Sequence, residues 1–204
     1  MKKMIILGCL ILYFGTMAYA QDKIEAPVWN VGDKWIFTSG DTMMVMNADE
    51  NSYTVKFLTS RGEEYISIRD KSSLNILYSM EGDKRIEYKG RTKRLLNFPL
   101  DIGKSWKDKF VSRARRSGLG DTENMYFETF TVLGSEDIVV KAEKFRAIKL
   151  EYKQEGMGGG RTWQGKAWYW YSPDVKYLVK WQYEKNPVWI GFYDWELTSF
   201  ELTK

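Results

Sequence analysis

The sequence predicts an all-β protein with few or no helices, and three patterns support this prediction. Between residues 34 and 89, short runs rich in β-branched and aromatic side chains follow one another, with polar turns between them. The spacing of these runs is typical of all-β domains, and turns this short join only antiparallel neighbours. The C-terminal third repeats the pattern with large aromatic residues at alternating positions. We therefore expect an antiparallel meander.

Six strands are expected in the first half of the chain, which we interpret as free of helices. Each run is four to nine residues long, the usual length of a strand. Segments such as NADEN at 47–51 and MEGDKR at 80–85 divide the runs, because Asn, Asp and Gly favour turns. The predicted strands are DKWIFTS (33–39), TMMVMN (42–47), SYTVKFLTS (52–60), EEYISIRD (63–70), LNILYSM (74–80) and RIEYKG (85–90).

Two segments in the second half need interpretation. Residues 107–134 predict two strands around a polar, basic loop at 112–124, whose arginines we interpret as solvated charges rather than an anion site. Residues 138–155 fit both a helical stripe and an alternating strand. We favour a turn at Ala142 and Glu143, then a strand from about 145 to 154 and a glycine-rich hairpin tip at 156–160.

The C-terminal third contains six of the nine tryptophans. In AWYWY, side chains alternate along the strand, so Trp168 and Trp170 are expected on one face and Tyr169 and Tyr171 on the other. The next two strands repeat the aromatic pattern, which predicts a common apolar layer or a cavity. Our candidate ligand-binding residues are Trp168, Trp170, Tyr171, Trp181, Tyr183, Trp189 and Trp195.

A Gly-x-x-Trp motif occurs at 32–35, 103–106 and 165–168. The first two copies follow an apolar residue and an upstream proline, which predicts a turn that leads into a strand. Gly32 and Gly103 are expected to adopt backbone angles that other residues avoid. The third copy has no upstream proline, so we interpret its likeness as accidental.

The N-terminus predicts export. Lys2 and Lys3, an apolar stretch at 5–14 and the small-residue signature at 18–20 are typical of a secretory signal peptide spanning residues 1–20. Residues 21–204 would then form a single β-rich domain, with no transmembrane segment. A less favoured alternative is cleavage and lipidation at Cys9, since ILGC superficially resembles a lipoprotein motif. We expect a periplasmic protein, with extracellular or outer-membrane-associated locations as alternatives.

Composition excludes several kinds of chemistry. The chain has no histidine, and its single cysteine, Cys9, lies in the predicted signal peptide. This excludes a thiol nucleophile, a Ser-His-Asp triad and a Cys or His metal site in the mature chain, and we expect no cofactor and no metal. Removal of residues 1–20 takes away two lysines and no acid, leaving 29 basic against 27 acidic residues, a net charge of +2. This near balance argues against nucleic-acid binding.

Three segments carry a resemblance to a known group of proteins. They are FPLDIGKSW (98–106), VLGSEDIVVKAEKFRAIKLEY (132–152) and WYWYSPDVKYLVKWQYE (168–184), and the span from the first to the last covers about half of the mature chain. They resemble exported bacterial domains of unknown function whose folds are similar to the curved-sheet lipoprotein carriers of the periplasm (LolA/LolB-like). The resemblance implies a strongly curved antiparallel sheet, a half-barrel or open barrel, around an apolar concavity where acyl chains can lie. It implies no catalytic residues.

Three functions remain open, and an enzyme is the least favoured. The leading hypothesis is a non-catalytic envelope domain that binds a lipid, another apolar ligand or an envelope protein partner in an aromatic-lined concave sheet. Alternatively, the same tryptophans form only the hydrophobic core and line no ligand site. The alternative is a carbohydrate-binding module with exposed tryptophan platforms, drawn from Trp163, Trp168 and Trp189. The third is a glycan-active enzyme with paired carboxylates, for which the candidates are Glu136, Asp137, Asp194 and Glu196.

Overall fold

The computed structural model describes residues 23–82, 84–87, 94–116, 120–184 and 193–204. The predicted signal peptide with Cys9, and the candidate Trp189, lie outside the described residues. The described residues form one twelve-stranded sheet, and their only helical element is a single 3₁₀ turn, η1, at Pro173–Val175. The prediction of an all-β fold is confirmed.

All six strands expected in the first half are present, and six more follow. In chain order the strands are β1 (Lys34–Phe37), β2 (Thr42–Ala48), β3 (Ser52–Leu58), β4 (Glu64–Asp70), β5 (Ile76–Glu81), β6 (Lys84–Glu87), β7 (Ser105–Arg116), β8 (Gly120–Val139), β9 (Lys144–Gly158), β10 (Arg161–Ser172), β11 (Tyr177–Tyr183) and β12 (Trp195–Glu201).

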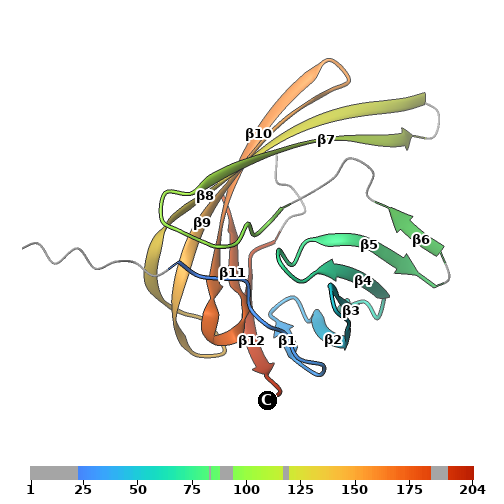
Figure 1. The fold of residues 1–204 in the computed structure, drawn as a ribbon. Coiled ribbons are helices and arrows are strands. Elements are labelled where there is room, and N and C mark those ends of the chain that lie inside the picture. The colour runs from blue at the N-terminus through green and yellow to red at the C-terminus, as the bar shows by residue number, and fades with distance from the viewer. Residues whose placement is uncertain (1–22, 83, 88–93, 117–119, 185–192) are drawn as a thin grey trace, which may run out of the picture.

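The sheet consists of two antiparallel meanders joined at one seam. The first meander runs from β1 to β6 and the second from β7 to β12, and β1 pairs with β12 to join them. The strand order is therefore β6-β5-β4-β3-β2-β1-β12-β11-β10-β9-β8-β7, and the sheet stays open because its two edges, β6 and β7, are not paired. Figure 1 shows the long strands β7–β10 bending over the shorter strands of the first meander. The predicted curved, open, antiparallel sheet is confirmed.

Each meander begins with the same turn, built from the first two Gly-x-x-Trp motifs. The N–H of Gly32 donates to the carbonyl of Val45, and the N–H of Val45 donates to the carbonyl of Asp33. The N–H of Gly103 and the N–H of Val132 repeat this pair of bonds at the start of the second meander. The two glycines have φ of 95° and 82°, in the left-handed region that glycine tolerates.

Strands β1 and β7 start directly after these turns, so the predicted structural role of the first two motifs is confirmed. The third motif is different, since Gly165 lies inside strand β10 and pairs with Gln154 of β9. The likeness of the third copy is therefore confined to the sequence.

One predicted loop is wrong in its extent. The bounds of the loop predicted at 112–124 are too wide, because β7 continues to Arg116 and β8 already begins at Gly120. Polar and charged residues prevail in this segment and hide the strand periodicity. The predicted turn at Ala142 and Glu143 is confirmed, since the N–H of Val140 donates to the carbonyl of Glu143 and β9 starts at the next residue.

The seam between the meanders is fixed by two buried tryptophans. The indole N–H of Trp35 donates to the carbonyl of Val175 at 2.7 Å, and the indole N–H of Trp29 donates to the carbonyl of Lys176 at 2.9 Å. The two indole rings lie 5.2 Å apart. The first meander is thereby anchored to the η1 turn of the second, and the aromatic residues of both meanders join in one core.

Candidate ligand-binding face

Aromatic side chains from consecutive strands of the second meander form a continuous row on one face of the sheet. Trp106 stacks on Phe130 with ring centroids 5.4 Å apart, and Phe130 lies 5.1 Å from Tyr152. Tyr152 in turn lies 6.0 Å from Trp181, and Tyr169 stacks on Trp181 at 4.9 Å. All five side chains are buried. This row, called the aromatic row below, is built by cross-strand neighbours, which places large rings side by side.

The row continues to the surface at its β12 end. Trp181 lies 6.4 Å from Trp195 and 5.8 Å from Tyr183, and both of these rings are half-buried. Burial first, and then the charge of Asp194, raise the pKa of Tyr183 to about 12, so its hydroxyl keeps its proton at neutral pH. The aromatic row thus runs from the core to the solvent without leaving one face of the sheet.

A polar group lies against the middle of the row. The carboxyl oxygen Oε1 of Glu128 accepts a hydrogen bond from the Tyr152 hydroxyl at 2.5 Å and another from the Gln154 amide at 3.1 Å. The hydroxyl of Tyr169 donates instead to the carbonyl of Leu95 at 2.6 Å. Burial and, secondly, the charge of Glu128 raise the pKa of Tyr169 well above its ordinary value. The row therefore holds one acid among rings that stay neutral.

The opposite face of the sheet carries Trp168 and Trp170 among lysines. The ammonium group of Lys166 lies 4.9 Å from the centre of the Trp168 ring, and that of Lys149 lies 5.1 Å from the Trp170 ring. The indole N–H of Trp170 donates to Glu136 at 2.7 Å. That hydrogen bond first, and then Lys149, lower the pKa of Glu136. Lysine stems and ion pairs thus cover these two rings, as a solvated face requires.

Five of the six candidate residues that the structure describes fall into two groups. Trp181, Tyr183 and Trp195 come together in the aromatic row, whereas Trp168 and Trp170 lie on the opposite face. The remaining candidate within the described residues, Tyr171, is buried with its ring 5.4 Å from Phe98.

Sequence reasoning missed several members of the row. The alternation of AWYWY places Tyr169 on the face opposite Trp168 and Trp170, on the side of the candidate Tyr171, but Tyr169 itself is not among the candidates. Phe130 and Glu128 lie in the run MYFETF at 125–130, where strand alternation places them on one face together. That alternation was the available signal, because it places Glu128 between the aromatic side chains of Tyr126 and Phe130 on one face, and an acid is unusual on an aromatic face.

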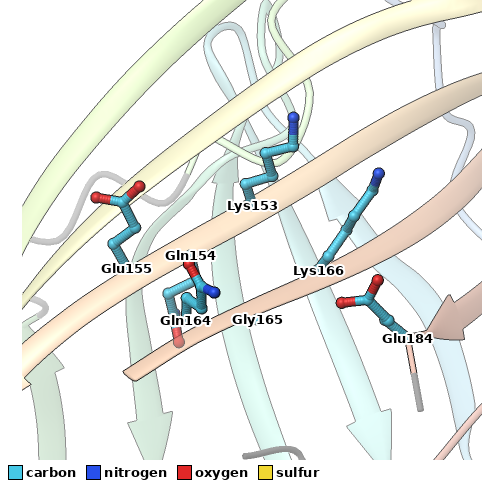
Figure 2. A pocket seen from close by; sticks show the side chains of 7 residues that line it. All are labelled: Lys153, Gln154, Glu155, Gln164, Gly165, Lys166 and Glu184. Carbon is cyan, nitrogen blue, oxygen red and sulfur yellow. The ribbon is translucent and has the colours of Figure 1, made fainter. Parts of the chain in front are cut away.

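Two open hollows lie among the described residues of the long strands. The smaller, of about 210 Å³, is polar and lined by Lys153, Gln154, Glu155, Gln164, Gly165, Lys166 and Glu184, as Figure 2 shows. The larger, of about 590 Å³, is lined by Phe127, Glu155, Gly156, Met157, Thr162, Trp163 and Gln164. The polar hollow combines two cations with two acids, so its charges balance. It therefore offers no strong preference for an anion or a cation.

Three of the four candidate carboxylates, Glu136, Asp137 and Glu196, are held in ion pairs. Asp137 contacts Lys144 at 2.8 Å and Arg146 at 3.3 Å, and these two cations lower the pKa of its carboxyl. Glu136 is paired with Lys149. A general acid needs a raised pKa, so the arrangement around Glu136 and Asp137 does not favour glycosidase chemistry. Within the described part of the chain, no three potential ligand residues gather as a metal site, and no helix is long and apolar enough to span a membrane.

No protein-family model and no curated protein matches the chain. Three solved structures are similar in fold. A Bacteroides fragilis protein, described as exported and with a YmcC-like fold, has 12% identity over 88% of this chain and 100% of its own, with a TM-score of 0.40. The hypothetical lipoprotein YmcC of Escherichia coli has 12% identity over 89% and 90%, with a TM-score of 0.43. A protein of Parabacteroides distasonis, described as a lipoprotein, has 14% identity over 89% and 100%, with a TM-score of 0.49. Such distant likeness assigns neither family nor function.

Proposed function

We propose that the protein is a non-catalytic envelope domain that binds a lipid or another amphipathic ligand along the aromatic row. The observation that carries this proposal is the course of the row, from five buried rings to the half-buried rings of Tyr183 and Trp195. A ligand chain that covers this end removes apolar surface from water, which is worth about 25 cal/mol per Å². The ligand class is the one implied by the resemblance to periplasmic lipoprotein carriers.

Substitution of Trp195 tests the proposal. Trp195→Ala removes the ring at the open end of the row, and we expect roughly a tenfold loss of affinity for a single-chain lipid, because a large apolar contact disappears. The affinity is measured by quenching of tryptophan fluorescence and by native mass spectrometry. Trp168→Ala is the matched control, since Trp168 is also half-buried but lies on the opposite face.

Other ligands in the same assay would overturn the proposal. Quenching by soluble glycans alone, abolished by Trp168→Ala, would replace lipid binding with the carbohydrate-binding alternative. Recovery of a stoichiometric protein partner without lipid, from protein purified from its own envelope, would replace it with a role in assembly.

A further inference from the structure

Glu128 differs from every other buried carboxyl group that the structure describes. Asp33 is fully buried and accepts four hydrogen bonds, including one from the ammonium group of Lys176. Asp108 accepts three hydrogen bonds, all from Arg94. Glu128 is 1% exposed, and among the described residues no cation lies against it. Among the described residues, Asp33 and Asp108 each have a cation beside them and Glu128 has none.

The described hydrogen bonds to the Glu128 carboxyl group all involve one of its two oxygens. Tyr152 and Gln154 both donate to the same oxygen, Oε1, and the Gln154 amide also donates to the Tyr152 hydroxyl at 2.6 Å. This closed triangle fixes the orientation of the carboxyl group. The second oxygen, Oε2, is buried and has no hydrogen-bond partner among the described residues. An acceptor left in this state is destabilising unless another group donates to it.

The described side chains near Glu128 do not supply the missing donor, and the indole N–H of Trp181, which is also buried without a partner among the described residues, makes no hydrogen bond to Oε2. The cross-strand partner of Glu128 is Asp108, whose negative charge is already matched by Arg94. The hydroxyl of Tyr169 is directed to Leu95. Within the described part of the chain, Glu128 is therefore an acid without a matching cation beside the aromatic row, and a positively charged donor fits it best.

We infer that Glu128 is the polar anchor of the ligand site and accepts the protonated amine head of a single-chain amphiphile. The inference rests on the proposed function, because the apolar chain of such a ligand would lie along the aromatic row. The ammonium group donates a hydrogen bond to Oε2 and matches the charge of the carboxylate, while the chain contacts the rings of Trp181 and Trp195. An amphiphile with an anionic head would meet the carboxylate with the same sign of charge and bind less well.

A series of ligands with the same chain tests the inference. Dodecylamine, dodecanol and dodecanoate are titrated into the full chain at neutral pH, below their micelle concentrations, by isothermal titration calorimetry. We expect dodecylamine to bind about tenfold tighter than dodecanol, and dodecanoate to bind most weakly. In Glu128→Gln the preference for the amine over the alcohol falls to about twofold or less.

Control measurements distinguish the loss of the Glu128 anchor from a loss of folding and from a failure of the proposed lipid binding. Glu151→Gln removes a carboxyl group that is paired with two lysines and belongs to the opposite face, and it should leave the head-group preference unchanged. If Glu128→Gln does not fold, Tyr152→Phe serves as the second variant. It removes one hydrogen bond that orients the carboxyl group, and we expect it to weaken the preference for dodecylamine over dodecanol. An unchanged preference would contradict the anchor. Equal binding of all three ligands to the unmodified chain would overturn the anchor and leave lipid binding intact. Absence of binding by all three would overturn both.

Discussion

Asp33 shows how one residue ties the segments next to the first and the last strand together. Its carboxyl group accepts hydrogen bonds from the backbone of Asn30 and Thr203, from the Thr203 hydroxyl and from Lys176. Asp33→Asn leaves the Lys176 ammonium without its partner, so we expect the free energy of unfolding to fall by about 3 kcal/mol. Urea denaturation measures this change. Glu201→Gln, in the exposed pair with Lys34, should change stability by less than about 0.5 kcal/mol.

Two glycines separate a backbone effect from a steric one. Gly103→Ala adds a methyl group that meets nothing within 4 Å, so only the φ of 82° opposes it, and we expect a loss of about 1 kcal/mol. Gly156→Ala meets the indole of Trp163 at a distance that no real contact allows, so that ring must move. We expect a loss of about 1–3 kcal/mol together with a shift of the tryptophan emission maximum, which Gly103→Ala should not show. A Gly156→Ala variant with unchanged emission would contradict the described position of Trp163.

The residue scale also shows where the sequence is least informative. Alternation in AWYWY predicts which rings share a face, and the structure places Tyr169 and Trp168 on opposite faces as expected. Alternation does not say which face becomes the core, because both carry large aromatic rings. Glu128 escaped prediction for a related reason: its burial depends on Tyr152 and Gln154, which lie 24 and 26 residues further along the chain.

At the scale of the elements, local turns made most strands predictable. The six strands of the first half are divided by short segments of Asn, Asp, Gly and Ser, and those residues set the strand ends through turn conformations. The sequence does not reveal the facing ends of β7 and β8, because charged residues prevail there and no apolar alternation marks the strands. The pairing of β1 with β12 could not be predicted, since these strands lie at opposite ends of the domain and no local signal joins them.

Carboxyl groups on β8 and β9 should make the stability of the protein depend on pH. Ion pairs and hydrogen bonds lower the pKa values of Glu136, Asp137 and Glu151 in the folded protein. Their contribution is therefore complete above the unfolded pKa values, near 4 to 4.5, and is lost as the pH falls through the lower folded values. Melting temperatures measured between pH 7 and pH 2.5 should decline below about pH 4.5. Asp137→Asn should make that decline shallower, and an unchanged slope would contradict the role of its ion pairs.

At the scale of the molecule, the β1–β12 seam decides how the two meanders unfold. The seam carries the Trp29 and Trp35 hydrogen bonds to the η1 turn, and its aromatic residues belong to the same core as the aromatic row. We expect both meanders to unfold in one transition. Coincident denaturation curves from tryptophan fluorescence and far-ultraviolet circular dichroism check this expectation, and two separated transitions would show that the meanders are independent.

The strand order makes the molecule a natural subject for circular permutation. The chain leaves the sheet at one edge, β6, and returns at the opposite edge, β7, while its first and last strands are neighbours at the centre. A permutant of residues 21–204 that opens within 88–93 and joins the old ends by a flexible linker would run through all twelve strands in spatial order. Every strand would then pair with its immediate successor in sequence, and the contact order would fall. Because folding rates rise as contact order falls, the permutant should refold faster than the parent while keeping the same sheet.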